Sequence, residues 1–148
     1  MTEAAVAAKK PIPIVPFLRS PDGGQPHLAG CKCGACGQIF LGDERTVCSA
    51  CSARGQMKPM TLSDRGELYV FSIIYRSFPG VETPFISAVV DLEGGGTVKG
   101  TLKNIAPDPD QIQLGMPVEI KYEIAPRKDK EGNEYLTYYF QPRSGHAG

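Results

Sequence analysis

Several features that commonly indicate a function are scarce in this sequence of 148 residues. Its 16 Lys and Arg residues balance 16 Asp and Glu residues, so it lacks the basic surplus of most proteins that bind nucleic acid through phosphates. It also lacks any apolar run approaching the roughly 18 residues that a membrane-spanning helix needs. Its first residues are too few for a secretory signal and include an early acid. We therefore expect a soluble cytoplasmic protein with no membrane partner and little tendency to bind nucleic acid.

Catalytic signatures are also scarce. The sequence has 2 histidines, His27 and His146, and neither lies near a Ser, Cys or carboxylate in a recognisable arrangement. No G-x-G-x-x-G or P-loop pattern occurs, because the glycines of Glu93–Gly96 stand between two predicted strands and predict a hairpin turn instead. The sequence therefore gives no support for catalysis by this chain alone.

Cysteine, in contrast, is concentrated in one place. All 5 cysteines lie between Cys31 and Cys51, and four of them form two C-x-x-C pairs, Cys33 with Cys36 and Cys48 with Cys51. Each pair can wrap a tight turn around one ion, so that both thiolates point to the same centre. Two such turns at the ends of a short hairpin complete a tetrahedral shell of sulfur, which suits zinc. The spacing predicts a zinc ribbon with these four ligands.

Other interpretations of the cysteines are weaker. A disulfide frame is disfavoured in a reducing cytoplasm, and a thioredoxin-like redox site needs one C-x-x-C pair at a strand–helix junction, not two matched pairs. Iron stays open as an alternative, because it accepts the same sulfur ligands. Cys31 could replace Cys33, but its spacing makes a poorer turn, so we expect a free thiol or a neighbour of the ligands. Four protein ligands leave no position for water, which indicates a structural metal.

The segment around the cysteines has little material for a core. Its apolar residues are Ile39, Phe40, Leu41, Val47, Met57 and Met60. Zinc can supply about 10 kcal/mol or more of folding free energy to such a segment, so we expect the metal to replace the missing core. Gly37 follows the first pair and accepts a positive φ, whereas Ser52 takes that place after the second pair and predicts a looser turn.

After the ribbon the pattern changes to strands separated by turn residues. Five strands are predicted, at residues 66–76, 84–92, 97–105, 117–124 and 135–142. Five strands with no long helix fit a small closed barrel of the OB type, whereas a β-sandwich of five strands would be thin. The expected fold class is mainly β: a rubredoxin-like zinc ribbon followed by a five-stranded OB-fold barrel.

Three features of these strands carry specific expectations. The four alternate apolar residues of segment 117–124, ending with Ile124, should face inward. Gly100, inside its strand, predicts a bulge or a barrel corner. The strand at 66–76 is apolar on both faces, so one face should line the core and the other should pack against the ribbon, the N-terminal arm or a partner protein.

These patterns divide the chain into four expected segments. Residues 1–27 should form an extended arm, because their prolines forbid a regular helix. Residues 28–60 should form the zinc ribbon, residues 61–142 the barrel and residues 143–148 a disordered tail. The apolar run of the arm should lie along the barrel surface, with docking to a partner as the alternative.

One combination of motifs is specific enough to indicate a family. Leu28 and Gly30 precede the first C-x-x-C pair, Gly37 follows it, and the long strand at 66–76 opens the barrel. Further along the chain, the motifs of the combination are Pro84-Phe85, Gly115-Met116-Pro117-Val118 and Phe140-Gln141-Pro142. Over residues 17–142 the chain thereby resembles the zinc-ribbon/OB-fold proteins once called domain of unknown function 35 (DUF35), which are described as acyl-CoA-associated.

The resemblance implies a non-catalytic accessory subunit of a thiolase-like complex, whose partner supplies the reactive cysteines and histidines. The small subunit of benzoylsuccinyl-CoA thiolase is a member of the family. The resemblance also implies that the barrel lies near the path of the acyl-CoA thioester and helps to form or gate its site. The candidate CoA contacts are Arg76, Ser77, Phe78, Pro79, Thr83 and Pro84. An arginine beside an aromatic side chain can meet a phosphate and an adenine.

A single-stranded nucleic-acid-binding OB/zinc-ribbon module is the alternative function. Tyr69, Phe71, Tyr75, Tyr138 and Tyr139 could offer stacking platforms for bases. Acidic residues lie in the same predicted sheet, however, and aromatic residues in strands more often belong to the core. We therefore expect the acyl-CoA function.

Overall fold

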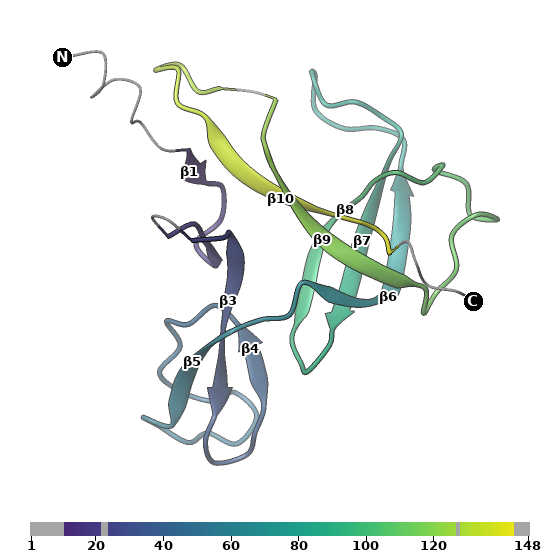
Figure 1. Ribbon diagram of the computed structural model, residues 1–148. Helices are drawn as coiled ribbons and strands as arrows, with labels where there is room; N and C mark the ends of the chain where they lie inside the picture. The colour runs from purple at the N-terminus through teal and green to yellow at the C-terminus, as the bar shows by residue number, and fades with distance from the viewer. Residues whose placement is uncertain (1–10, 22–23, 127, 144–148) are drawn as a thin grey trace.

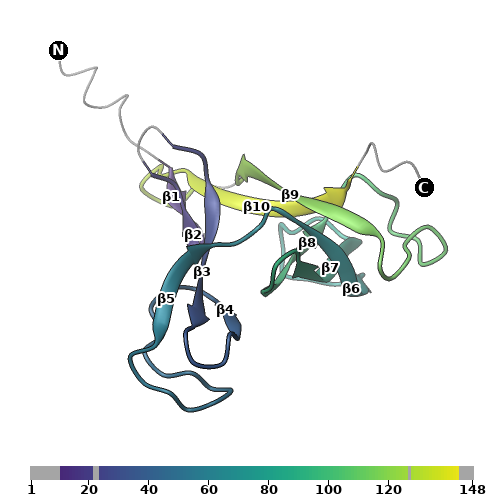
Figure 2. The same cartoon turned by 60° about the horizontal axis from the view of Figure 1, so that its bottom comes forward.

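Strands and turns make up the part of the chain that the structure describes. This computed structural model describes residues 11–21, 24–126 and 128–143, so the expectations for residues 1–10, for His146 and for most of the tail fall outside it. In chain order the strands are β1 (Ile12–Pro13), β2 (Leu18–Arg19), β3 (His27–Cys33), β4 (Ile39–Leu41), β5 (Met57–Thr61), β6 (Arg65–Ile74), β7 (Phe85–Leu92), β8 (Thr97–Leu102), β9 (Pro117–Ile124) and β10 (Tyr135–Pro142). A small lobe holds β3 to β5, and a larger lobe holds β6 to β10 (Figures 1 and 2). Within the described ranges, no helix is long and apolar enough to cross a membrane.

The five strands of the larger lobe close into a barrel. Around the barrel the order is β6, β7, β8, β10, β9 and back to β6. Neighbouring strands are antiparallel, except for the parallel pair of β8 and β10. This is the connectivity of a five-stranded OB barrel. The predicted fold class is confirmed, and each observed strand ends within a few residues of its predicted segment.

Alternate residues of the barrel strands point inward and form one core. Val118 and Phe140 have no exposed surface, and Ile120 is nearly as buried. Burying a large apolar side chain contributes about 2 kcal/mol. The inward prediction for segment 117–124 is wrong for Ile124, which is 42% exposed. Strand β9 pairs with β6 over its first three residues only, so the far end of β9 has β10 as its one neighbour in the sheet.

The glycine within β8 makes room for two aromatic rings and does not form a β-bulge. Gly100 faces Ala88 of β7 in a continuous register. A β-carbon at Gly100 would lie 2.9 Å from ring atoms of both Phe140 and Tyr138. The register shift of the barrel instead lies in β6, where Tyr69 is the extra residue. Of the two alternatives predicted for Gly100, a bulge or a barrel corner, the bulge is wrong, because the requirement there is close approach of aromatic side chains.

The ribbon packs on the barrel through a glycine turn. Strand β3 is central in the ribbon and pairs antiparallel with β4 and β5. The predicted hairpin turn between β7 and β8 is confirmed, and φ is positive at Gly94, Gly95 and Gly96. A β-carbon on Gly95 would lie 2.4 Å from Cδ1 of Ile39 in β4. The turn therefore lets the barrel backbone meet the ribbon directly.

The N-terminal arm joins the two lobes. Strand β1 pairs in parallel with β10, with Ile12 beside Tyr135, and β2 pairs antiparallel with β3. Leu18 is fully buried, and the ring centroid of Phe17 lies 6.1 Å from that of Tyr138. The prediction that the arm lies along the barrel is confirmed for its described residues, and the same arm also reaches the ribbon.

Candidate functional site: a four-cysteine metal centre

The four predicted ligands come together in the ribbon. Cys33 ends β3 and Cys36 follows it, while Cys48 and Cys51 lie in the loop between β4 and β5. Their Sγ atoms lie within 4.8 Å of one another, with 3.7 Å from Cys33 to Cys51 and 3.6 Å from Cys36 to Cys48. Zinc–sulfur bonds of about 2.3 Å in a tetrahedron place sulfur atoms about 3.8 Å apart, whereas a disulfide bond is about 2.05 Å. The four free thiols could hold one metal ion.

The two turns have the same backbone. In the first turn the N–H of Gly37 donates to the carbonyl of Cys33 at 2.8 Å, and in the second the N–H of Ser52 donates to the carbonyl of Cys48 at 2.8 Å. The φ angle is +83° at Gly37 and +68° at Ser52. A left-handed conformation costs a residue with a β-carbon about 1 kcal/mol. Ser52 therefore holds a conformation that glycine adopts without that cost.

Backbone N–H groups and burial set the charge of the metal-free thiols. The N–H of Cys36 lowers the pKa of Cys33 to about 7, although burial opposes it. Burial raises the pKa of Cys48, but hydrogen bonds, above all from the N–H of Cys51, outweigh it and lower this pKa too. The N–H of Ala53 lowers the pKa of Cys51, but burial and the neighbouring thiols raise it to about 12. The metal-free site therefore disfavours the ionisation of all four thiols. A bound cation would balance the charge of four thiolates.

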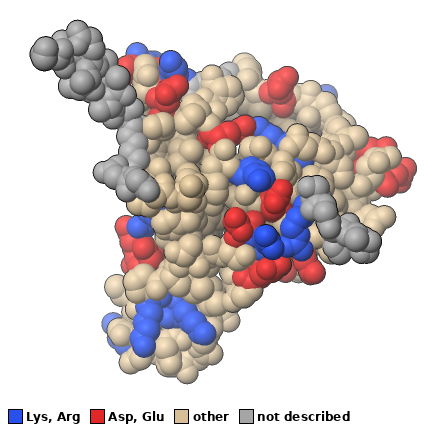
Figure 3. Space-filling model, in the orientation of Figure 1, with Lys and Arg blue, Asp and Glu red and all other residues tan. Residues whose placement is uncertain are grey.

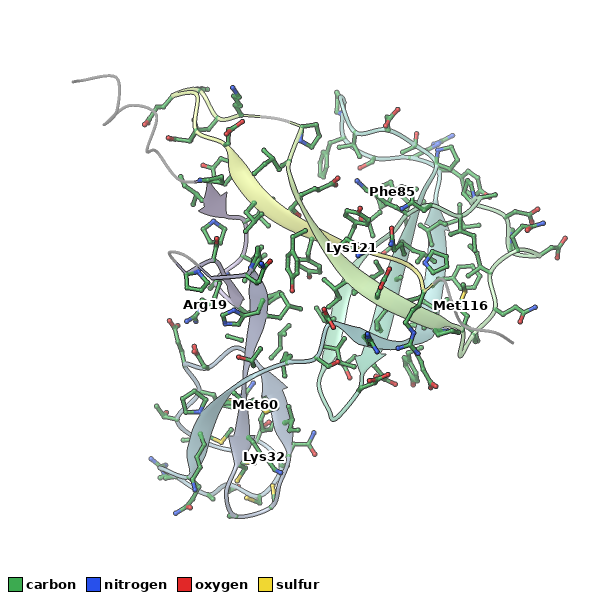
Figure 4. The ribbon with its side chains drawn as sticks, in the orientation of Figure 1. Arg19, Lys32, Met60, Phe85, Met116 and Lys121 are labelled. Carbon is green, nitrogen blue, oxygen red and sulfur yellow. The ribbon has the colours of Figure 1, made fainter. Side chains whose placement is uncertain are left out.

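Two lysines face each other beside this site. Lys32 of β3 stands directly opposite Lys58 of β5, an arrangement that costs stability in a sheet. Cε of Lys58 lies 3.8 Å from the place of a β-carbon on Gly34, inside the first turn. Basic side chains gather over the ribbon end of the face in Figure 3, and Figure 4 labels Lys32 there. A divalent ion with four thiolates carries two negative charges, which such a pair would offset. Sequence reasoning missed the pair, because only the strand register brings it together.

Cys31 lies outside the ligand group. It is in β3, opposite Phe40 of β4 and Pro59 of β5, and is 1% exposed. Burial raises the pKa of its thiol, which disfavours the thiolate needed of a ligand or nucleophile. The fifth cysteine is therefore a buried free thiol of the ribbon.

The six candidate CoA contacts lie on the connection between β6 and β7, at the end of the barrel away from the ribbon (Figure 1). Arg76 is exposed, and Phe78 is 83% exposed. Pro84, which follows a cis peptide bond, lines a cleft of about 330 Å³ together with Lys103 and Asn104. Residues 76–79 do not line this cleft. The structure therefore brings the Pro84 end of the candidate set to a concave surface and leaves the other end in solvent.

The five aromatic residues of the nucleic-acid alternative do not form one platform. Tyr69 and Tyr75 are 63% and 66% exposed. Phe71 and Tyr138, in contrast, pack against the core. The ring of Tyr139 is covered by Nζ of Lys103, 4.9 Å from the ring centroid. These five side chains thus offer no continuous stacking surface.

A second cleft lies between the arm and the loop after β4. It has a volume of about 600 Å³, and its lining includes Arg19 and Asp43, whose charged groups lie 2.6 Å apart. His27 lies outside it, with Nδ1 3.4 Å from the carbonyl of Gln25. The ion pair of Arg19 and Asp43 therefore fixes one side of this cleft.

Comparisons with known proteins agree with this geometry. Residues 60–123 match the family described as the ChsH2 C-terminal OB-fold domain. A DUF35 domain-containing scaffold protein of Methanothermobacter thermautotrophicus is 28% identical over 121 residues, which cover 80% of this chain and 88% of that protein. The DUF35 resemblance is confirmed.

Two further similar proteins have names that include an enzyme. Benzoylsuccinyl-CoA thiolase subunit BbsA of Geobacter metallireducens is 46% identical over 72 residues, which cover 48% of this chain and 47% of that protein. The solved structure of an Ltp2-ChsH2(DUF35) aldolase matches with a TM-score of 0.60 and 25% identity, over 78% of this chain and 84% of that chain.

Proposed function

We propose that this DUF35 relative is a non-catalytic subunit that assembles with a thiolase-type catalytic subunit and helps to form its acyl-CoA site. The observation that carries the proposal is a four-thiol centre joined to an OB barrel, in a chain similar to a protein named as a thiolase subunit. The similarity to an aldolase structure with DUF35 in its name supports the same role. A subunit of benzoylsuccinyl-CoA thiolase is the specific form of this proposal.

In this proposal the ribbon is a structural zinc site held by Cys33, Cys36, Cys48 and Cys51. Bound zinc would cross-link the two turns and supply folding free energy. Four thiolates fill a tetrahedral shell and leave no position for water or a thioester oxygen. Elemental analysis should find one zinc ion per folded chain. A coloured protein that contains iron would instead show that iron is the structural metal.

The acyl-CoA contacts would come from Arg76, Ser77, Phe78, Pro79, Thr83 and Pro84. No described carboxylate pairs with the guanidinium of Arg76, and the ring of Phe78 is open to solvent. A phosphate and an adenine can use such groups. Lys103, in the cleft beside Pro84, is already neutralised, because its Nζ lies 2.5 Å from Glu123.

Purification of the tagged protein from its native cell extract tests the assembly. We expect a thiolase-type protein, identified by mass spectrometry, in fixed stoichiometry with this chain. Thioester turnover should require both proteins. Thioester turnover by this chain in isolation would overturn the proposal. So would a monodisperse monomer that does not bind the co-expressed thiolase.

A further inference from the structure

The outer face of β6 and β7 is apolar. Val70 stands opposite Val89 and Ile74 opposite Phe85, with a pair of serines between them. The alternate residues of β7 are buried in the core, so these pairs lie on the outside of the barrel. Val70 is 44% exposed, and the other three are half-buried. No charged residue lies within these three cross-strand pairs.

This face continues into the connection that follows β6. Tyr75, Phe78 and Val81 are 66%, 83% and 42% exposed, and Tyr69, at the bulge, is 63% exposed. With Val70 they are five of the ten large apolar side chains that are exposed in the described part of the chain. We call this set, together with Ile74, Phe85 and Val89, the β6–β7 face. Half of the exposed apolar side chains therefore gather in one region, where a partner would be expected.

The described residues outside the β6–β7 face leave it uncovered. The ribbon meets the barrel at Gly95, at the other end of β7, and the arm packs on β10 near Tyr138. The sequence predicts that the second apolar face of β6 packs against the ribbon, the arm or a partner. Since the ribbon and the described residues of the arm lie elsewhere, a partner protein is the occupant that we infer.

The rim of the β6–β7 face carries charges of both signs: Glu67 stands opposite Asp91 at one end, and two cations lie beside the apolar pairs. Lys99 of β8 stands opposite Val89, and Arg76 follows Tyr75. Neither cation has a carboxylate within salt-bridge distance among the described residues, unlike Lys103. An apolar centre with two cations that lack carboxylate partners fits a partner surface that is apolar at its centre and carries carboxylates opposite these cations.

Resting on the proposed function, we propose that the thiolase-type catalytic subunit docks on the β6–β7 face. Its contact surface would be apolar, with carboxylates that face Arg76 and Lys99. The candidate CoA contacts lie on the same connection, so a subunit docked here would bring its thioester site to the junction of the two proteins. Assembly with the catalytic subunit and contact with acyl-CoA would therefore occur at the same surface of this chain.

Binding of the purified catalytic subunit to full-length variants tests this location. Val70→Lys and, separately, Tyr69→Ser should weaken binding at least tenfold, and Lys99→Glu should weaken it less and flatten its salt dependence. Val47→Lys is the matched control, because Val47 is an exposed valine of the ribbon, and its binding should stay at the wild-type level. Metal content and thermal midpoint establish that each variant folds.

The outcomes separate this inference from the proposed function. Wild-type binding by folded Val70→Lys and Tyr69→Ser would overturn the docking site and leave the accessory role standing. A wild-type protein that binds no thiolase-type subunit would overturn both. A wild-type chain that is dimeric by light scattering, with a monomeric Val70→Lys variant, would assign the face to a second copy and overturn the inference.

Discussion

The ribbon and the barrel build similar antiparallel strands but stabilise them differently. The barrel encloses hydrocarbon, including the fully buried Phe140, Val90 and Val118. In the ribbon, thiols occupy comparable positions, since Cys31, Cys33 and Cys48 are at most 1% exposed. A segment too poor in apolar residues for its own core can still fold when an ion cross-links its turns. The two lobes should therefore respond to different perturbations.

The largest effect should follow loss of the metal. Cys33→Ser, or a strong chelator, should remove the ion and with it on the order of 10 kcal/mol of ribbon folding free energy. Hydrogen exchange should show loss of protection in β3 to β5, while β6 to β10 stay protected. Cys31→Ala is the control and should retain one metal ion per chain. Equal loss of protection in both lobes would contradict the division between them.

The next prediction concerns a substitution in the apolar core of the barrel. Phe140→Ala should lower the free energy of unfolding of the barrel by about 3–5 kcal/mol, because the cavity adds to the lost burial. Ile124→Ala, at an exposed position of β9, should change it by less than about 0.5 kcal/mol. Denaturant unfolding measures both, and metal content should stay unchanged. Release of the metal by Phe140→Ala at low denaturant would show that the ribbon depends on the barrel core.

A smaller effect should distinguish the two cysteine turns. Ser52→Gly should raise ribbon stability by up to about 1 kcal/mol, because φ at this position is positive. Gly37→Ala should lower it by a similar amount for the same reason. Metal competition with a chromogenic chelator measures both variants. If the two substitutions change metal affinity in the same direction, backbone strain is not the difference between the turns.

The smallest effect concerns a loop of the barrel. The side-chain amide of Asn133 is the main cause that lowers the pKa of Asp129 from 3.8 to about 2. A lowered pKa means that ionised Asp129 stabilises the fold above about pH 4, and that this contribution is lost as the pH falls toward 2. Amide exchange at Tyr135 should therefore differ between wild type and Asp129→Asn at pH 5 and converge near pH 2. A difference that persists at pH 2 would exclude ionisation as the cause.

Local patterns were sufficient for most of the fold. Runs of strand-forming residues between turn residues indicated the five barrel strands, turn glycines indicated the β7–β8 hairpin, and cysteine spacing indicated the four-thiol group. Features that depend on which strands are neighbours were not predictable. Lys32 and Lys58 meet through the register of β3 and β5, and Ile124 is exposed because β6 stops pairing with β9. The error at Gly100 has the same origin, since the rings that require a glycine come from β10.

The parallel pairing of β1 with β10 has a consequence for biosynthesis. The arm leaves the ribosome early, but its site on the barrel is incomplete until the last strand has been translated. The cysteine loop, in contrast, is finished by residue 61 and can capture its ion while the barrel is still being made. Vectorial synthesis would thus complete the metal-binding hairpin and its pairing with β2 first, and add the pairing of β1 last.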